Sequence, residues 1–196
     1  MNRKSIFLLA IGILLMSKSY AQIDSLPVRN NIKLKIPTGG YKHFFSEFTL
    51  VGLQYERLLT SKNSISLSAH FSNSAKDRTT VEGTIQHYKQ VMLLPQWRHY
   101  LRKNKQNYFN GFYVGFSTAY MRDYIYRIDN TEKRHLIGAG ALIGYQQVIK
   151  KKLSIGFTPS LHYGANFSTT NSTVRQERKT EGSLIYLLDF HIGYIF

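Results

Sequence analysis

Five charged residues of this sequence are spaced so that they could share one buried surface. They are Lys33, Lys35, Glu56, Arg98 and Asp189. Each falls on the polar side of a segment in which polar and apolar residues alternate, and alternate residues of a β-strand point to the same face. Because a buried charge is tolerated only when it is paired, we expect Arg98 and the two lysines to neutralise the two carboxylates. Such a cluster predicts a structural plug of salt bridges, with a narrow, charge-selective pore as the alternative.

The seven histidines suggest metal binding, but their spacing does not support it. They stand at positions 43, 70, 87, 99, 135, 162 and 191, with no HxH or HExxH pattern among them. His70, His162 and His191 fall on the same polar side as the charged cluster, but in three separate segments. A zinc site needs three or four ligands that converge, and nothing in the spacing brings these together. We therefore predict no metal site and no cofactor.

An enzymatic alternative rests on residues near one end of the segments in which polar and apolar residues alternate. His135 stands close to Glu132, and two serines, Ser168 and Ser172, follow in residues 168–182. Lipid A-modifying barrels of this size use a serine, a histidine and an acid near the membrane surface. Because a triad is recognised by its geometry and not by an inventory of residues, we assign no catalytic residue. We favour a non-enzymatic protein and keep a lipid A-modifying or other lipid-acting enzyme as the alternative.

The last thirteen residues indicate which kind of element positions these side chains. Every second residue from Leu184 to Phe196 is large and apolar or aromatic, while Asp189, His191 and Gly193 occupy the other side. A strand with one face in lipid and the other in a polar lumen has this pattern. The closing segment is therefore typical of a strand of an outer-membrane β-barrel.

Eight segments of this kind run along the chain, and Pro95 predicts a bulge or local distortion in the fourth, because proline cannot donate a ladder hydrogen bond. The segments are 31–37, 48–59, 63–73, 88–101, 108–120, 135–147, 153–167 and 184–196. Short connections (60–62, 102–107, 148–152) alternate with long polar ones (38–47, 74–87, 121–134, 168–182). We predict an all-β fold: an eight-stranded, antiparallel, up-and-down transmembrane barrel with short periplasmic turns and four longer extracellular loops. A soluble barrel fits less well, because its polar face would not consist of the small residues that fill a narrow lumen.

The N-terminus predicts export. Arg3 and Lys4 precede an apolar run from Ile6 to Met16, and Ser19-Tyr20-Ala21 offers a cleavage site, which is the layout of a signal peptide. We expect a signal peptide over 1–21 and one barrel domain over 22–196. Removing Arg3, Lys4 and Lys18 leaves 23 basic against 11 acidic residues, a net charge of about +12. Export and the scatter of the basic residues argue against a nucleic-acid partner. The absence of cysteine excludes a disulfide framework.

The charge distribution predicts lipid partners at both ends of the barrel. Basic residues in the long connections could bind lipopolysaccharide phosphates. The short turns are basic without an acid, at Lys62, Arg102, Lys103, Lys105 and 150–152. By analogy with other anionic membrane surfaces, each lysine near the headgroups contributes about 1 kcal/mol of attraction.

The chain resembles the small bacterial outer-membrane β-barrel families of unknown function. The resemblance rests on five segments in order: Val51-Gly-Leu-Gln-Tyr-Glu56, Leu94-Pro-Gln-Trp-Arg-His-Tyr100, Gly111-Phe-Tyr-Val-Gly115, Gly138-Ala-Gly-Ala-Leu-Ile-Gly-Tyr145 and Gly193-Tyr-Ile-Phe196. It implies an outer-membrane location and no catalytic residue. It also implies that the terminal strand, with Tyr194 and Phe196, is the signal read by the barrel-assembly machinery. We expect a monomer that serves envelope integrity, adhesion or ligand binding through its extracellular loops.

Overall fold

The computed structural model describes residues 30–41, 51–74, 78–80, 83–101, 109–127, 130–172 and 176–196. Their regular structure consists of β-strands: β1 (Asn30–Tyr41), β2 (Val51–Leu58), β3 (Asn63–Ser74), β4 (Arg78–Thr80), β5 (Gly83–Tyr100), β6 (Gly111–Arg127), β7 (Asn130–Ile149), β8 (Leu153–Ser172) and β9 (Gln176–Ile195). Among these residues no helix is long and apolar enough to cross a membrane. The signal peptide predicted over 1–21 lies outside the described residues.

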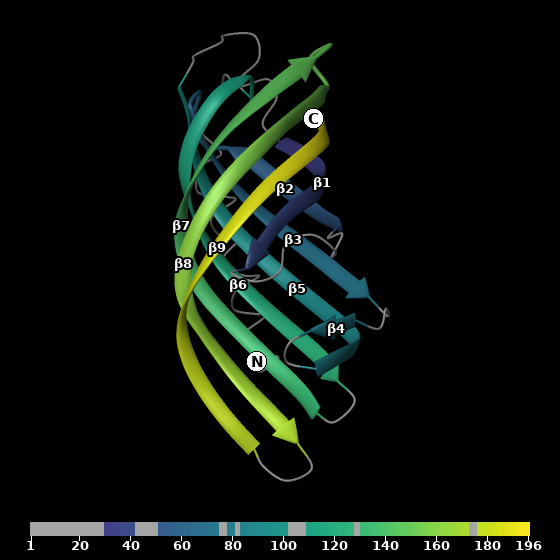
Figure 1. Ribbon diagram of the computed structural model, residues 1–196. Helices are drawn as coiled ribbons and strands as arrows, with labels where there is room; N and C mark the ends of the chain where they lie inside the picture. The colour runs from purple at the N-terminus through teal and green to yellow at the C-terminus, as the bar shows by residue number, and fades with distance from the viewer. Residues whose placement is uncertain are drawn as a thin grey trace, which may run out of the picture.

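The eight long strands form a closed antiparallel ring (Figure 1). Each pairs with its neighbour along the chain, β9 pairs with β1, and β3 pairs directly with β5. The short β4 pairs with the start of β5, beyond the end of β3. This ring confirms the predicted fold class, an all-β barrel of eight antiparallel strands.

Pro95 interrupts one ladder without changing its register. The β3–β5 pairing runs through it, with Leu67 opposite Pro95. On the other side, the β5–β6 pairing skips from Leu93 to Gln96 and resumes in the same register. The distortion predicted at Pro95 is therefore a local gap in one ladder and not a bulge.

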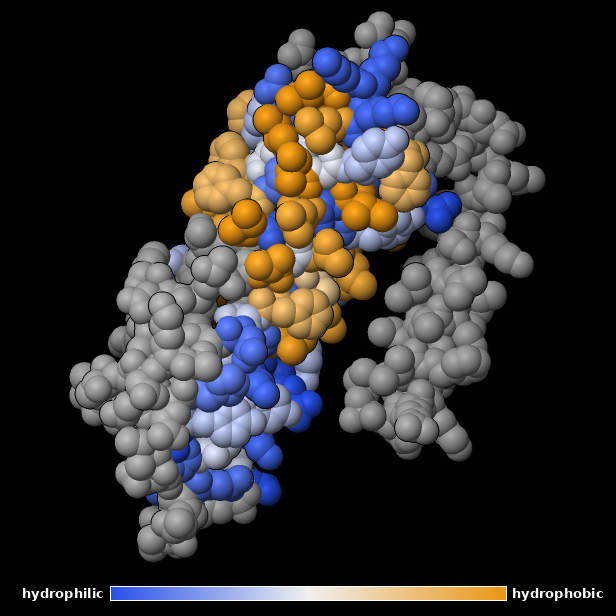
Figure 2. Space-filling model, turned by 90° about the vertical axis from the view of Figure 1, so that its right-hand side faces the viewer, coloured by the Kyte–Doolittle hydropathy of each residue, from blue (hydrophilic) through white to orange (hydrophobic). Residues whose placement is uncertain are grey.

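Buried and exposed side chains alternate along the strands, and the exposed ones form an apolar belt. In β6 the alternation is unbroken from Gly111 to Ile125. Phe116 and Tyr163 are each 68% exposed, although both are large aromatic residues. A protein surface of this kind is stable only against an apolar surrounding. Figure 2 shows the belt as a band across one half of the molecule, with a hydrophilic surface beyond it.

The strands are longer than the sequence indicated, and three predicted loops are mostly strand; one of them, 74–87, contains β4 and the start of β5. Residues 121–134 and 168–182 belong largely to β6 through β9, which have 17 to 20 residues each. Crossing a membrane takes only about 9 to 11 residues. On β7 the belt covers 137–145, so the rest of the strand extends beyond it. There the outward residues become polar, and hydrophobic alternation fades while the backbone pairing continues. In Figure 1 these hairpin ends reach well past β1–β3.

The interior is layered. Along β5 the inward residues are first Met92 and Leu94, then Gln96 and Arg98, then Tyr100. The first pair belongs to an apolar cluster with Ala119, Met121, Leu136, Ile185 and Leu187. Tyr100 belongs to a second cluster with Leu58, Phe109, Tyr113, Leu142 and Ile195. The charged residues therefore lie between two apolar layers.

Candidate functional site

The five charged residues predicted from the sequence meet in the middle layer of the lumen. Lys33 and Lys35 stand two residues apart on β1, so both point inward, and β1 lies between β2 and β9. The Lys33 ammonium contacts the Glu56 carboxylate of β2, and the Lys35 ammonium contacts the Asp189 carboxylate of β9. Arg98 Nη1 lies 3.3 Å from Glu56 Oε2. All five side chains are 0% exposed, so the charged layer is buried within the barrel.

Neutral neighbours complete the hydrogen bonding of these charges. The Ser64 hydroxyl donates to Glu56 Oε1 over 2.5 Å and the Tyr100 hydroxyl over 2.9 Å. Arg98 Nη2 donates to Gln96 Oε1 over 2.6 Å, and its guanidinium lies 4.7 Å from the centre of the Tyr113 ring. Nothing in the sequence indicates these partnerships of the two tyrosines. They depend on the β5–β6 register, which sets Tyr100 opposite Tyr113.

The three inward histidines are buried at separate places. His191 Nε2 lies 3.2 Å from Gln146 Oε1, whereas neither ring nitrogen of His70 has a hydrogen-bond partner among the described residues. His162 Nε2 lies 2.5 Å from the Ser117 hydroxyl. That pair has the geometry of a nucleophile and a base. However, both side chains are buried, and within the described structure His162 Nδ1 has no hydrogen-bond partner that could orient the ring. The described part of the chain contains no group of three residues placed to hold a metal ion.

Glu132 and His135, the basis of the enzymatic alternative, point to opposite faces of β7. Glu132 faces the lumen and accepts hydrogen bonds from Arg127 Nη1 over 2.9 Å and Arg134 Nε over 2.5 Å. Burial raises the pKa of Glu132, but the two arginines outweigh it and hold the pKa below its usual value. His135 faces outward, 3.4 Å from the Tyr120 hydroxyl. These two residues therefore cannot belong to one triad.

The outward surface beyond the belt is basic. Lys89 on β5 and Lys133 on β7 both stand directly opposite Tyr124 of β6. The Arg122 guanidinium lies 4.8 Å from the centre of the same ring. Together with partial burial, the charges of Arg122 and Lys133 lower the pKa of His135, as expected for cations gathered at one place.

The acidic residues of the described strands stand on the lumen side of the barrel wall, opposite to these outward cations. In each strand, alternate positions face the lumen side of the wall. All six acidic residues within the described strands stand at such positions: Glu56, Asp123, Glu132, Glu177, Glu181 and Asp189. Among the described residues, the outward face of the barrel wall therefore carries positive charge without an acidic residue to offset it.

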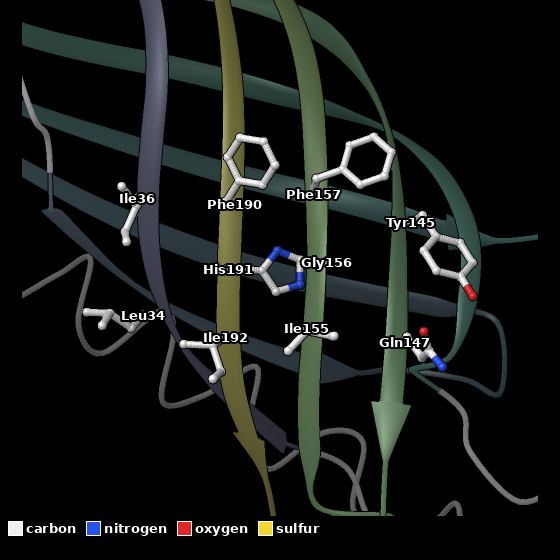
Figure 3. A pocket seen from close by; sticks show the side chains of 10 residues that line it. All are labelled: Leu34, Ile36, Tyr145, Gln147, Ile155, Gly156, Phe157, Phe190, His191 and Ile192. Carbon is white, nitrogen blue, oxygen red and sulfur yellow. The ribbon is translucent and has the colours of Figure 1, made fainter.

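A groove crosses the lipid-facing side of the wall between β1 and β7 (Figure 3). It has a volume of about 480 Å³ and is lined by Leu34, Ile36, Tyr145, Gln147, Ile155, Gly156, Phe157, Phe190, His191 and Ile192. Figure 3 shows Phe157 and Phe190 toward one end and Ile155 and Ile192 toward the other. The groove is almost wholly apolar and open to the membrane side.

The comparisons with known proteins agree with this architecture. A family model described as "Protein of unknown function (DUF3575)" matches residues 13–186. No curated protein matches the chain. The chain is similar to the crystal structure of outer membrane protein OprG from Pseudomonas aeruginosa, with a TM-score of 0.61, 12% identity and coverage of 86% of this chain and 96% of that one.

Two further solved structures have the same fold. The outer membrane protein AlkL, determined in DMPC bilayers, matches with a TM-score of 0.62 and 7% identity over 90% of this chain and 94% of that one. Neisserial surface protein A matches with a TM-score of 0.52 and 9% identity over 86% of this chain and 97% of that one. At such low identities the likeness concerns the fold alone.

Proposed function

Since this chain belongs to the DUF3575 family of proteins of unknown function and is an outer-membrane β-barrel protein, we propose that it is a closed, non-enzymatic envelope protein that binds lipopolysaccharide phosphates with its outward cations. The observation that carries this proposal is the group of Lys89, Arg122 and Lys133, which we call the rim cations. Among the described residues, no acid shares their face of the wall. In this proposal the barrel works through its outer surface and not through its lumen.

The depth of the rim cations supports a headgroup contact. Tyr120 and Ile137 stand opposite each other at the edge of the belt. Arg122 and Lys133 lie two and four residues beyond that row, or about 7 to 14 Å along the strands. Lipid phosphates lie just outside the hydrocarbon core, and arginine and lysine are the usual residues that bind them.

The orientation is part of the proposal. The hairpin ends of β6–β9 would face the outside, and both termini and the short turns would face the periplasm. An even number of strands places the two ends of the chain on the same side, and short turns are typical of the periplasmic end. The rim cations would then lie in the outer leaflet, where lipopolysaccharide is found.

Lipid A binding tests the proposed site. The double variant R122Q/K133Q should bind lipid A at least about tenfold more weakly than the unchanged protein, because charge-assisted hydrogen bonds contribute roughly 1.5 to 3 kcal/mol each. The control R57Q/K62Q removes two positive charges at the other end of the barrel. Titration of the detergent-solubilised proteins with lipid A would measure the effect. Equal affinity in all three proteins, or an equal loss in the control, would refute the site.

The lumen and the enzymatic alternative have separate tests. Because the middle layer is fully buried, the purified protein should show no steady conductance in planar bilayers. Lipid A from cells with and without the gene should give the same acylation pattern in mass spectrometry. A regular channel from the unchanged protein would contradict the closed barrel, and an altered pattern would show an enzyme.

A further inference from the structure

The lipid-facing groove ends close to a turn made of three lysines. Lys150, Lys151 and Lys152 connect β7 to β8, and all three are exposed. Ile149 pairs with Leu153 next to the turn, and the next outward pair is Gln147 with Ile155, both of which line the groove. The groove therefore begins three residues, or about 10 Å of strand, from the nearest lysines.

The turn has a backbone shape that lysine does not favour. Lys150 has a φ of 49° and Lys151 a φ of 64°, and Lys152 N donates to Ile149 O over 3.2 Å. Two consecutive residues with positive φ are the mark of a type I′ turn, in which Asn-Gly is preferred. Lysine in this conformation is less stable than glycine. A sequence that nevertheless has lysine at both positions indicates that their charge is used.

The apolar and basic parts of this region match the two parts of one lipid. The groove of about 480 Å³ falls within the roughly 300 to 1,000 Å³ of small-molecule sites. Its walls are exposed apolar side chains, among them Ile155 (38%), Phe190 (49%) and Ile192 (49%). Among the described residues, the three lysines of the turn have no acidic partner.

We propose that the groove and the turn together bind one anionic phospholipid of the membrane leaflet on the side of the short turns. An acyl chain lies along Ile155 and Ile192, and the phosphate is held by Lys150–Lys152. Gln147 is the polar residue at the turn end of the groove, where its amide can donate to the lipid esters. The assignment of this leaflet to the periplasmic side rests on the proposed function, but binding itself does not depend on it.

The variant K150N/K151G separates binding from folding. It removes two charges and places the preferred Asn-Gly pair in the turn, so it should fold at least as well as the unchanged protein. Its affinity for phosphatidylglycerol should nevertheless fall about tenfold. R57Q/K62Q is the matched control, because it removes two charges at the same end but away from the groove. The measurement is native mass spectrometry of the full chain, titrated with phosphatidylglycerol, phosphatidylcholine or lipid A.

A second variant tests the groove independently of the charges. Ile155→Trp adds a larger apolar side chain to the groove and should weaken phosphatidylglycerol binding with all lysines in place. Unchanged affinity in K150N/K151G or in Ile155→Trp, or equally tight binding of phosphatidylcholine, would overturn the proposal. Lipid A binding should depend on Arg122 and Lys133 and not on the turn. A failure of this site is therefore distinguishable from a failure of the proposed function.

Discussion

Asp123 is a carboxyl buried on the inner face of β6, beyond the apolar belt. Burial raises its pKa to about 6, although Gln90, Arg134 and Tyr88 act in the opposite direction. The folded protein therefore holds this proton more tightly than the unfolded chain, and the carboxylate destabilises the fold once the pH rises past the unfolded value of 3.8. The cost grows up to about pH 6 and stays constant above it.

Replacing Asp123 with asparagine should therefore stabilise the barrel in a pH-dependent way. Two pKa units correspond to roughly 2 to 3 kcal/mol, so Asp123→Asn should raise the free energy of unfolding by up to about that amount at pH 8 and leave it nearly unchanged at pH 4. Urea unfolding in detergent micelles at both pH values would measure this.

Glu132→Gln is the control with the opposite sign, because the pKa of Glu132 is lowered. It should destabilise the barrel at pH 8 and lose that effect as the pH falls below 4.5. If either substitution changed the free energy of unfolding equally at pH 4 and pH 8, the pKa shift assigned to that residue would be contradicted.

Glu56 has four partners in the lumen, namely Lys33, Ser64, Arg98 and Tyr100. Replacing it with glutamine leaves Lys33 and Arg98 buried without a counter-charge, which costs about 3 to 5 kcal/mol. The double variant K33M/E56M should recover part of this loss, because an apolar pair of similar size needs no partner. Thermal unfolding of the three proteins would compare them. A Glu56→Gln barrel as stable as the unchanged one would show that the network is not the structural plug we predict.

At the scale of the element, β7 and β8 approach each other closely at Gly140. A Cβ atom at Gly140 would lie 2.0 Å from the carbonyl oxygen of Leu161, and a backbone atom cannot swing aside as a side chain can. Gly140→Ala should therefore destabilise the β7–β8 pair by at least the roughly 1 to 3 kcal/mol of ordinary overpacking. Ala139→Val on the outward face of the same strand is the control and should fold normally. The heat-induced gel shift of the two barrels would distinguish them.

How far the sequence predicts an element depends on what surrounds it. Within the belt, lipid on one side and a filled lumen on the other force apolar and polar residues to alternate strictly. The order of the strands, the face to which each residue points and the meeting of the five charged residues could therefore be predicted. Outside the belt, water lies on the outward side, so Arg122 and Lys133 look like loop residues although they stand in paired strands. The inward apolar cluster around Met92 and Leu136 was also missed, because an apolar residue on the lumen side breaks the expected pattern. The rim cations and the groove arise from pairing across strands, which the order of residues alone does not show.

At the scale of the whole molecule, the barrel is closed where the start of β1 meets the end of β9. Asn30 N donates to Phe196 O over 3.1 Å, and Phe196 N donates to Asn30 O over 2.9 Å. The Tyr194 and Phe196 rings are stacked, with 6.5 Å between their centres. The terminal residue therefore has two separable parts: a backbone that completes the seam and a ring that faces outward.

The proposed assembly signal resides in the ring, so Phe196→Ala should lower the amount of protein in the outer membrane while the purified chain still refolds in detergent. Deleting Phe196 removes the seam hydrogen bonds as well, and refolding should then also suffer. Phe190→Ala, which removes an equally exposed ring farther from the terminus (49% against 50%), is the matched control and should insert normally. Quantitative blotting of outer-membrane fractions would measure insertion. Normal insertion of Phe196→Ala would assign the residue to closure alone, because its backbone would then account for every effect of the deletion.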